Sequence, residues 1–377
     1  MPPTDPFPAV TPLRFAELEG WPTLDVVPAL AAFRRSAVAS TTASPNGATV
    51  LAAPETRAPA AGGVSAALLD AAFQALVATP DPVSQTQARR FFEQAFEPVR
   101  VETPGFVTGY YEPLVAGSRE RTDAFTVPLY VPPSDLVTVP PESEGAPGRF
   151  VQSLPDGSTR DYPDRATIEA GALAGRGLEI AWLADPIDAF FVHVQGSARL
   201  ALPDGTTMRV GYAAKNGHRF TAIGRVLVQE GRLALEEADM AGLRRWLAAH
   251  PAEMRRVLDQ NRSFIFFREM PDDEPEAGPI GGAGVALTPL ASLAVDRLLH
   301  AYGTPILVEA PTLVVEGAPF RRLMVAQDTG SAIVGPARGD IFTGSGASAG
   351  ALAGGIRHPA RFTLLRPREN SVERADR

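Results

Sequence analysis

Apolar residues first recur at the spacing of helices and later at the shorter spacing of strands. Helical spacing is found in residues 27–37, in the alanine- and leucine-rich run 64–77, and in 84–96. Ser84 is a suitable N-cap for the last of these segments. Residues 40–63 are small, polar and interrupted by proline, which is typical of a surface loop or linker. We therefore expect a small helical layer at the start of the fold.

From about residue 106 the pattern predicts a mainly β structure with some α-helix. Apolar runs predict strands at 125–131, 190–194, 263–268, 305–308, 322–326 and 361–365. Helices are predicted at 164–173 and 236–250, and the latter continues into 252–261. Short strands with long irregular connections favour barrels over a doubly wound sheet.

Two dipeptides predict tight turns within the β region. Asp204-Gly205 separates the strand-like runs 198–202 and 207–210, and Asp156-Gly157 is a second signal of the same kind. Glycine in these pairs supplies the positive φ that two-residue hairpin loops require. A β-hairpin is therefore predicted around Asp204.

Composition and charge exclude several classes of function. The 377 residues include 34 glycines and 36 prolines, which favour turns and short strands. A formal net charge of −8 repels phosphate backbones, so no nucleic-acid partner is expected. The absence of cysteine excludes disulfides, zinc–thiolate sites and cysteine nucleophiles. The five histidines are scattered, so we expect neither a metal nor a cofactor.

The start of the chain carries no recognisable targeting signal. It lacks the basic and apolar regions of a signal peptide, and no run reaches the roughly 18 apolar residues of a membrane helix. Without cysteine there is also no acylation site of the bacterial lipoprotein kind. The sequence leaves two alternatives open: a cytoplasmic protein, or one whose leader has been replaced by the initiating methionine.

The glycine-rich stretch 344–350 superficially matches the G-x-G-x-x-A pattern of dinucleotide-binding folds. That pattern needs a βαβ unit and an acidic residue about 20 positions further on. Too few residues follow position 350 to supply the rest of that fold. The better interpretation is a loop whose small residues let the backbone approach a ligand or another strand closely.

Asp328-Thr329-Gly330-Ser331 follows an apolar run and matches the active-site signature of aspartic proteases. Those enzymes need two carboxylates about 3 Å apart that share one proton. The chain contains no second Asp-Thr-Gly or Asp-Ser-Gly. The alternative is a turn in which the carboxylate of Asp328 accepts backbone N–H bonds.

Asp340 stands twelve residues later, before Ile341 and Phe342. By its local context alone, an aspartate beside a glycine is more often a turn residue. A carboxyl beside apolar groups in a partly closed site would nevertheless have a raised pKa, which suits a general acid.

Two polar stretches, Gln195-Gly196-Ser197 and Lys215-Asn216-Gly217, follow apolar runs that read as strands. Their amide, hydroxyl and ammonium groups offer the mixed donors and acceptors that suit sugar recognition. Spacing alone favours hairpin turns about equally.

Together these segments resemble the MltA family of membrane-bound lytic murein transglycosylases. The matching stretches occur in family order between about residues 100 and 367, and are highly specific in combination. They are Gly109-Tyr110-Tyr111-Glu112-Pro113, Val194 to Ser197, Gly211 to His218, 260–267, 287–296 and 323–341.

The resemblance implies a two-domain β architecture. A discontinuous double-psi β-barrel domain with an N-terminal helical layer would comprise residues 1–111 and 262–377. A second, barrel-like β-domain would be inserted at 112–261. The glycan would lie in the groove between the two domains.

The resemblance also implies an activity: exolytic cleavage of the β-1,4 bond between N-acetylmuramic acid and N-acetylglucosamine in peptidoglycan. The family's catalytic aspartate falls on Asp340, which would act first as acid and then as base, forming a 1,6-anhydromuramoyl product. The substrate-binding residues it implies are Asp328, Tyr110, Tyr111, Gln195, Gly196, Ser197, Lys215, Asn216 and Gly330.

The same resemblance implies a partner and a location. The partner would be the glycan strands of peptidoglycan, bound by a monomer in the periplasm or at the outer membrane. Peripheral or lipoprotein attachment to the membrane would belong to the full-length form. A non-catalytic glycan-binding module remains the main alternative, although the presence of Asp340 argues against it.

Overall fold

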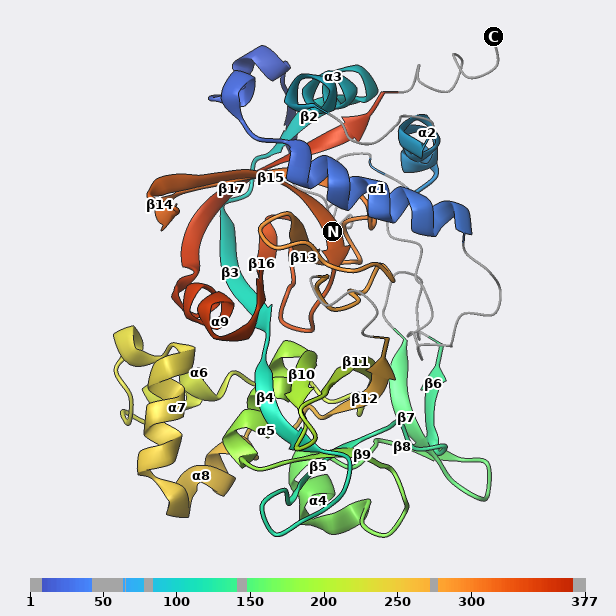
Figure 1. Cartoon of the computed structure of the whole chain (residues 1–377), viewed down its shortest axis with the longest axis vertical. Helices are drawn as coiled ribbons and strands as arrows, with labels where there is room; N and C mark the ends of the chain where they lie inside the picture. Colours follow the sequence, from blue (N-terminus) through green and yellow to red (C-terminus); the bar gives the residue numbers. More distant parts are fainter. Residues whose placement is uncertain are drawn as a thin grey trace, which may run out of the picture.

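The computed structural model describes residues 9–42, 64, 66–77, 84–140, 148–271 and 277–368. Two β structures lie one above the other in Figure 1, with helices above the first and beside the second. Strand β3 (Gly105–Glu112) belongs to the first and runs directly into β4 (Leu114–Ser118) of the second. The chain therefore passes from one β structure to the other at Pro113.

The first β structure is a closed barrel of six strands. Around the barrel the order is β3, β16, β13, β15, β14 and β17, and β17 closes the ring by pairing with β3. The other five strands are β13 (Ser292–Val295), β14 (Pro305–Val315), β15 (Ala318–Asp328), β16 (Arg338–Ser345) and β17 (Arg357–Pro367). Two short strands, β1 (Val10–Pro12) and β2 (Phe96–Val101), extend the sheet beyond β17. The predicted mainly β fold with a barrel domain is confirmed.

Apolar side chains fill the barrel. Ile306, Met324 and Ile341 come from three different strands and are fully buried in one cluster, together with Val308 and Phe362. Alternate residues of a strand point to opposite faces, so one face of each strand supplies this core. The interior of the barrel is consequently a packed apolar core.

Three helices cover one end of the barrel, as the apolar spacing predicted (Figure 1). They are α1 (Val27–Thr42), α2 (Ala66–Val77) and α3 (Gln85–Ala95). Phe33 of α1 packs against Phe73, Phe91, Phe92 and Phe96. The hydroxyl of Ser84 accepts a bond from the backbone N–H of Gln87, so Ser84 caps α3 as predicted. Most of the predicted loop 40–63 lies outside the described residues.

A buried amide ties α1 to the barrel. Gln327 of β15 is fully buried, and its Nε2 donates to the carbonyl of Ala32 at 2.7 Å and to the hydroxyl of Ser36 at 2.8 Å. Its Oε1 accepts from the hydroxyl of Ser292 at 2.6 Å. Because Gln327 precedes Asp328, the helical layer fixes the end of β15 where the candidate site begins.

The second β structure is a six-stranded sheet in the order β12, β11, β10, β4, β9 and β5. Its remaining strands are β5 (Val127–Tyr130), β9 (Glu179–Leu183), β10 (Ser197–Ala201), β11 (Thr207–Lys215) and β12 (Ile265–Met270). Strands β10 and β11 form the hairpin predicted at Asp204-Gly205, where Gly205 has φ 83°. A three-stranded sheet, β6 (Leu136–Val139), β7 (Arg149–Ser153) and β8 (Thr159–Arg160), contains the turn predicted at Asp156-Gly157.

Strand β12 bears on the boundary that the resemblance implies for the insert. The resemblance places residues 262–377 in the barrel domain, but Ile265–Met270 pairs with β11 of the second sheet. We therefore propose that the inserted domain extends to Met270. The alternation of this short strand could not reveal which of two β structures it would join.

Helices α4 (Arg165–Thr167), α5 (Pro186–Gln195), α6 (Ile223–Gln229), α7 (Met240–Ala249) and α8 (Pro251–Leu258) belong to the second structure. The helices predicted at 164–173 and 236–250 are confirmed, the first continuing from α4 into a π-helical turn, Ile168–Ala172. No helix in the described ranges combines the length and apolar character needed to cross a bilayer.

The strand predicted at 190–194 is wrong, because these residues form the second half of α5. Asp185 caps this helix by accepting from the N–H of Ile187 at 2.8 Å, and Pro186 occupies its first turn. Gly196 ends it in the left-handed conformation, with φ 83°. These helix-end signals outweigh the apolar run, which a buried helix and a buried strand share.

The loop predicted at 344–350 is also corrected, since it contains the first turns of helix α9 (Gly346–Gly355). Close approach of the backbone is nevertheless present. A Cβ on Gly350 would lie 2.7 Å from a ring carbon of Tyr111, so only glycine fits.

A fully buried carboxylate stands where the two β structures join. Glu112 ends β3, and its oxygens pair with Arg199 of β10 at 2.9 Å and Arg209 of β11 at 3.0 Å. The hydroxyl of Ser345, from the barrel, donates to the same carboxylate at 2.7 Å. Both guanidinium groups also donate to the carbonyl of Ala277. Groups from both structures thus converge on Glu112.

Candidate active site

Asp340 lies on β16, in register with Thr108 of β3 on one side and Ala294 of β13 on the other. Its Oδ1 accepts a hydrogen bond from the hydroxyl of Thr108 at 2.6 Å. That hydroxyl in turn accepts from Nη2 of Arg338 at 2.6 Å. The carboxyl is therefore held by a short chain of hydrogen bonds that begins two residues before it on the same strand.

Asp328 occupies the end of β15, on the other side of β13. Its Oδ2 accepts from the phenol of Tyr110 at 2.8 Å. Its Oδ1 accepts from the backbone N–H groups of Gly282 at 2.8 Å and Thr329 at 2.9 Å. This is the backbone-binding turn that the local sequence allowed as an alternative to a protease site.

The two aspartates flank a single small residue. Ala294 of β13 is in register with Asp340 on one side and with Asp328 on the other. Tyr110, two residues beyond Thr108 on β3, binds Asp328. The structure thus brings together three of the predicted site residues. No hydrogen bond joins the two carboxyl groups among the described residues, so the shared-proton pair of an aspartic protease has no counterpart here.

Burial has the largest effect on the pKa values of Asp340, Asp328 and Tyr110. It raises the pKa of Asp340 from 3.8 to about 6, and the negative charge of Asp328 adds to the rise. The hydroxyl of Thr108 and the positive charge of Arg338 oppose it. Burial also raises the pKa of Asp328, against its three hydrogen bonds, and that of Tyr110. A carboxyl with a pKa near 6 is suited to donate and then accept a proton at near-neutral pH.

Lys215 brings the second sheet to this site. Its Nζ donates to the hydroxyl of Ser331 at 3.0 Å, and so joins the end of β11 to the loop that follows Asp328. Burial, reinforced by the charge of Arg297, lowers the pKa of Lys215. Gly330 lies exposed in the same loop. The predicted sugar-binding roles of Lys215 and Gly330 stay predictions. Gly330 is two residues from Asp328, and Lys215 contacts the same loop through Ser331.

Tyr111, Gln195, Gly196 and Ser197 gather where α5 meets β3. The side-chain oxygen of Gln195 accepts from the backbone N–H of Tyr111 at 3.0 Å. The ring of Tyr111 packs against α9, Gly196 caps α5, and Ser197 begins β10 with its side chain buried. These contacts give each residue a structural role, whether or not it also contacts sugar.

Asn216 is buried to 1% exposure, and its amide is fully occupied by the backbone. Its nitrogen donates to the carbonyls of Pro163 and Arg262, and its oxygen accepts from the N–H of Phe264 and, at 3.4 Å, of His218. An amide engaged in this way has no donor or acceptor left for a sugar. We infer that Asn216 supports the end of β11, in place of the sugar-binding role predicted for it.

Replacing Asn216 by alanine is therefore expected to lower the free energy of unfolding by about 2 kcal/mol, because buried backbone groups lose their partner. Denaturant unfolding would measure this change. The neighbouring change Lys215→Met, which removes one hydrogen bond, should cost less than about 1 kcal/mol. If Asn216→Ala is as stable as the parent but binds peptidoglycan more weakly, the sugar-binding role of Asn216 is supported instead.

Sequence reasoning missed Thr108 and Arg338. Arg338 carried a usable signal, because residues two apart on a strand share a face and it precedes Asp340 by two. Thr108 carried none, because its position depends on the parallel pairing of β3 with β16, two segments far apart in the chain.

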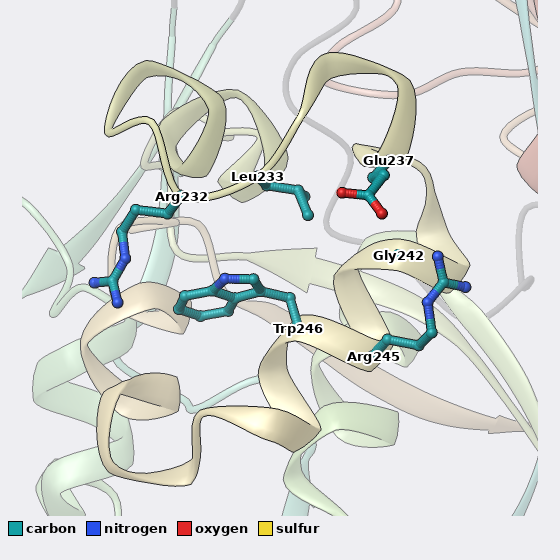
Figure 2. A pocket seen from close by; sticks show the side chains of 6 residues that line it. All are labelled: Arg232, Leu233, Glu237, Gly242, Arg245 and Trp246. Carbon is teal, nitrogen blue, oxygen red and sulfur yellow. The ribbon is translucent and has the colours of Figure 1, made fainter.

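A pocket of about 240 Å³ lies away from the aspartates, among the helices of the second structure. Figure 2 shows the side chains around it, which come from α7 and the segment that follows α6: Arg232, Leu233, Glu237, Gly242, Arg245 and Trp246. The indole of Trp246 stacks on His250 with ring centroids 4.2 Å apart, while Arg232 lies 5.1 Å from its centroid. The indole of Trp246 is thus already in contact with an aromatic and a cationic side chain.

Comparison with known proteins gives two domain matches in chain order. Residues 106–268 match the MltA specific insert domain, and residues 291–366 match the 3D domain. The first match begins within β3 and ends within β12. The second begins just before β13 and ends within β17, so it covers the barrel strands that carry both aspartates.

Two curated relatives carry the name membrane-bound lytic murein transglycosylase A. The protein of Escherichia coli K12 is 36% identical over 267 residues, and that of Vibrio cholerae is 33% identical over 265 residues. The aligned segments are 69% and 68% of this chain. The chain spans 65% and 64% of the length of these two relatives.

Solved structures extend the likeness to almost the whole chain. The crystal structure of the membrane-bound lytic murein transglycosylase from Agrobacterium tumefaciens is 42% identical, with a TM-score of 0.85, and the match covers 97% of this chain and 99% of that one. MltA from Neisseria gonorrhoeae, in its monoclinic form, is 29% identical with a TM-score of 0.75, over 97% and 96% of the two chains. From its sequence, its two domains and its fold, the chain belongs to the MltA family.

Proposed function

We propose that this protein is a lytic transglycosylase that cleaves the β-1,4 bond between N-acetylmuramic acid and N-acetylglucosamine in peptidoglycan. The observation that carries the proposal is the carboxyl of Asp340, whose pKa is raised to about 6 and which is oriented by Thr108. Relatives named as murein transglycosylases support the substrate. So does the structure of the E. coli relative with bound chitohexaose.

One carboxyl can perform both halves of this reaction. Protonated Asp340 gives its proton to the glycosidic oxygen, the bond from that oxygen to C1 of the muramic residue breaks, and N-acetylglucosamine leaves as an alcohol. The resulting carboxylate takes the proton of the muramic C6 hydroxyl, whose oxygen bonds to C1. The product is the 1,6-anhydro sugar, and Asp340 regains its proton. Because the nucleophile belongs to the substrate, no second catalytic carboxylate and no bound water are required.

Asp328 and Tyr110 support this cycle without sharing the proton transfer. The carboxylate of Asp328 already accepts three hydrogen bonds, so it is a poor acid or base. Its negative charge contributes to the raised pKa of Asp340 and so favours the protonated form at the start. We assign it to electrostatic tuning and to holding the phenol of Tyr110 beside the bound sugar.

Digestion of purified peptidoglycan, followed by mass spectrometry of the products, tests the proposal. Anhydromuropeptides, each one water lighter than the hydrolytic product, are expected. Reducing-end products would identify a hydrolase, and intact glycan that still binds the protein would identify a binding module. If the protein cleaves a protein substrate and Asp328→Ala abolishes that cleavage, the aspartic protease hypothesis is supported instead.

The reaction should be fastest on the acidic side of neutrality. Asp340 must be protonated when substrate binds, so kcat/KM is expected to fall tenfold per pH unit above a midpoint near the raised pKa of about 6. Initial rates of turbidity loss in peptidoglycan suspensions, corrected for enzyme stability at each pH, would show this limb. A rate that stays constant from about pH 4 to pH 9 would rule out Asp340 as the acid.

The site of action follows from the substrate. We propose that the protein works as a monomer in the periplasm or at the outer membrane, where its glycan is found. The membrane-bound names of the relatives support attachment of the full-length form.

A further inference from the structure

The hydrogen-bond chain at Asp340 has a fixed direction because it begins with a group that cannot accept. A guanidinium carries donors only and stays charged at all pH values relevant to proteins. Arg338 directs Nη2 to the hydroxyl of Thr108 at 2.6 Å and Nη1 to the carbonyl of Gly339. Its guanidinium also lies 5.9 Å from the ring centroid of Phe106. These contacts hold Arg338 in place beside Thr108.

The hydroxyl of Thr108 carries a single proton, and it can donate this proton only away from Arg338. Its oxygen already accepts from Arg338, so the hydroxyl cannot donate toward that side. The carboxyl oxygen Oδ1 of Asp340 lies at 2.6 Å and receives the proton. Oδ1 is thus an acceptor in both protonation states of Asp340. Because the C=O oxygen of a protonated carboxyl accepts hydrogen bonds more strongly than its OH oxygen, this bond favours the proton on Oδ2.

We propose that Arg338 and Thr108 are positioning residues that reserve Oδ2 of Asp340 as the oxygen that donates and later recovers the catalytic proton. This inference rests on the proposed function, since it assigns the acid/base atom of that reaction. It disfavours the arrangement in which Oδ1 carries the proton. A carboxyl that was free to carry the proton on either oxygen would present it toward the glycosidic oxygen for only part of the time.

The other charged and titratable groups around Asp340 do not take over the hydrogen bonds of Arg338 and Thr108. From β3, Tyr110 directs its hydroxyl to Asp328, and from β15, Asp328 accepts from Tyr110 and two backbone amides. Beyond the end of β13, the carboxylate of Asp296 accepts from the N–H groups of Gly335 and Leu298. Among the hydrogen bonds found in the described residues, only Thr108 donates to the carboxyl of Asp340.

The same chain limits how far burial raises the pKa of Asp340. A hydroxyl polarised by a guanidinium stabilises the carboxylate, so it opposes the effect of burial. Removing the hydroxyl should raise the pKa by about one unit, as expected for the loss of a hydrogen bond to a charged group. It should also lower kcat more than it changes KM, because Thr108 orients the acid and need not contact the sugar.

The test compares Thr108→Val with Thr108→Ser in the full chain. Selectively ¹³C-labelled aspartate carboxyls would be titrated by NMR, and the Asp340 signal identified by its loss in Asp340→Asn. The midpoint should rise by about one unit in Thr108→Val and stay within about 0.3 units of the parent in Thr108→Ser. The descending limb of the pH–rate profile should shift in parallel, and serine should restore most of kcat.

Arg338 supplies a second, independent pair of variants. In Arg338→Gln the side-chain oxygen can accept from Thr108, so the hydroxyl can turn away from Oδ1, and the positive charge is lost as well. The midpoint should then rise at least as far as in Thr108→Val. Arg338→Lys keeps a cation that only donates, so its midpoint should stay closer to that of the parent.

An unchanged midpoint in both Thr108→Val and Arg338→Gln, in protein that melts like the parent, would overturn the proposal. So would a shift in Thr108→Ser as large as that in Thr108→Val, because packing would then explain both. The NMR titration needs no activity. If the variants show these shifts but the parent protein forms no anhydro products, the proposed function is overturned. The assigned role of the hydrogen-bond chain from Arg338 through Thr108 to Asp340 would still be supported.

Discussion

Peptidoglycan cleavage should fall about a thousandfold or more when Asp340 is replaced by asparagine, because the proposed reaction uses this carboxyl twice. Asparagine keeps the size of the side chain and can still accept from Thr108, but it cannot give a proton to the leaving oxygen or take one from the C6 hydroxyl. Anhydromuropeptides counted by mass spectrometry over a fixed digestion time would measure the loss. Asp123→Asn, at an exposed aspartate, is the matched control and should digest at the parental rate.

The stability of the same variant shows whether the loss is chemical. Folding raises the pKa of Asp340 from 3.8 to about 6, so the folded state binds protons more tightly and the free energy of unfolding falls as pH rises between these values. Asparagine does not ionise, so the variant does not lose this part of the free energy of unfolding as pH rises. Asp340→Asn should therefore melt close to the parent near pH 4 and at a higher temperature near pH 7. A variant that melts well below the parent at neutral pH, or one that keeps forming anhydro products, would contradict the assigned role.

A large loss of stability is expected from Glu112→Ala. Removing one partner from a buried ion pair typically costs about 3–5 kcal/mol, because the remaining charge stays buried without compensation. Here Arg199 is 16% exposed and Arg209 is 4% exposed, and both would lose the carboxylate of Glu112 while keeping their hydrogen bonds to the carbonyl of Ala277. The midpoint of guanidinium chloride unfolding, monitored by tryptophan fluorescence, measures the change. Because Trp182 lies in the second structure and Trp21 near the barrel, separate transitions would reveal that the two had come apart.

Glu269→Ala provides the comparison for Glu112, because Glu269 also pairs with an arginine but at the surface. The Arg119 and Glu269 side chains are 53% and 47% exposed, and exposed pairs contribute about 0–1 kcal/mol. A Glu112→Ala variant no less stable than Glu269→Ala would mean that the buried cluster does not hold the two β structures together.

Local sequence signals predicted the elements whose ends are marked by their own residues. Ser84 capped a helix as expected, and Asp204-Gly205 made its hairpin. The same kind of signal, had it been weighed against the apolar run, would have identified α5 from Asp185 and Gly196. Strand β12 could not be assigned in this way, because three α-helices and a 3-10 helix separate it from its partner β11 in the sequence.

The candidate site was accessible to sequence reasoning only in part. Local context ranked Asp328 above Asp340, since Asp-Thr-Gly is the better-known signature, and the chain-long resemblance reversed that order. The structure explains the local signal differently, as a carboxylate bound by Gly282, Thr329 and Tyr110. The geometry around Asp340 depends on strand pairing between distant segments, which no local spacing encodes.

The pairing of β3 also bears on how the protein is made. During synthesis β3 leaves the ribosome long before β16 and β17, its neighbours in the barrel. The strands of the second sheet, from β4 to β12, are made in that interval and find all their partners within it. The inserted domain can therefore fold early, while barrel closure waits for the last strand and is slowed by its long-range contacts. Until then β3 presents an unpaired edge, and this nascent state is the one in which we expect the chain to be most prone to aggregate.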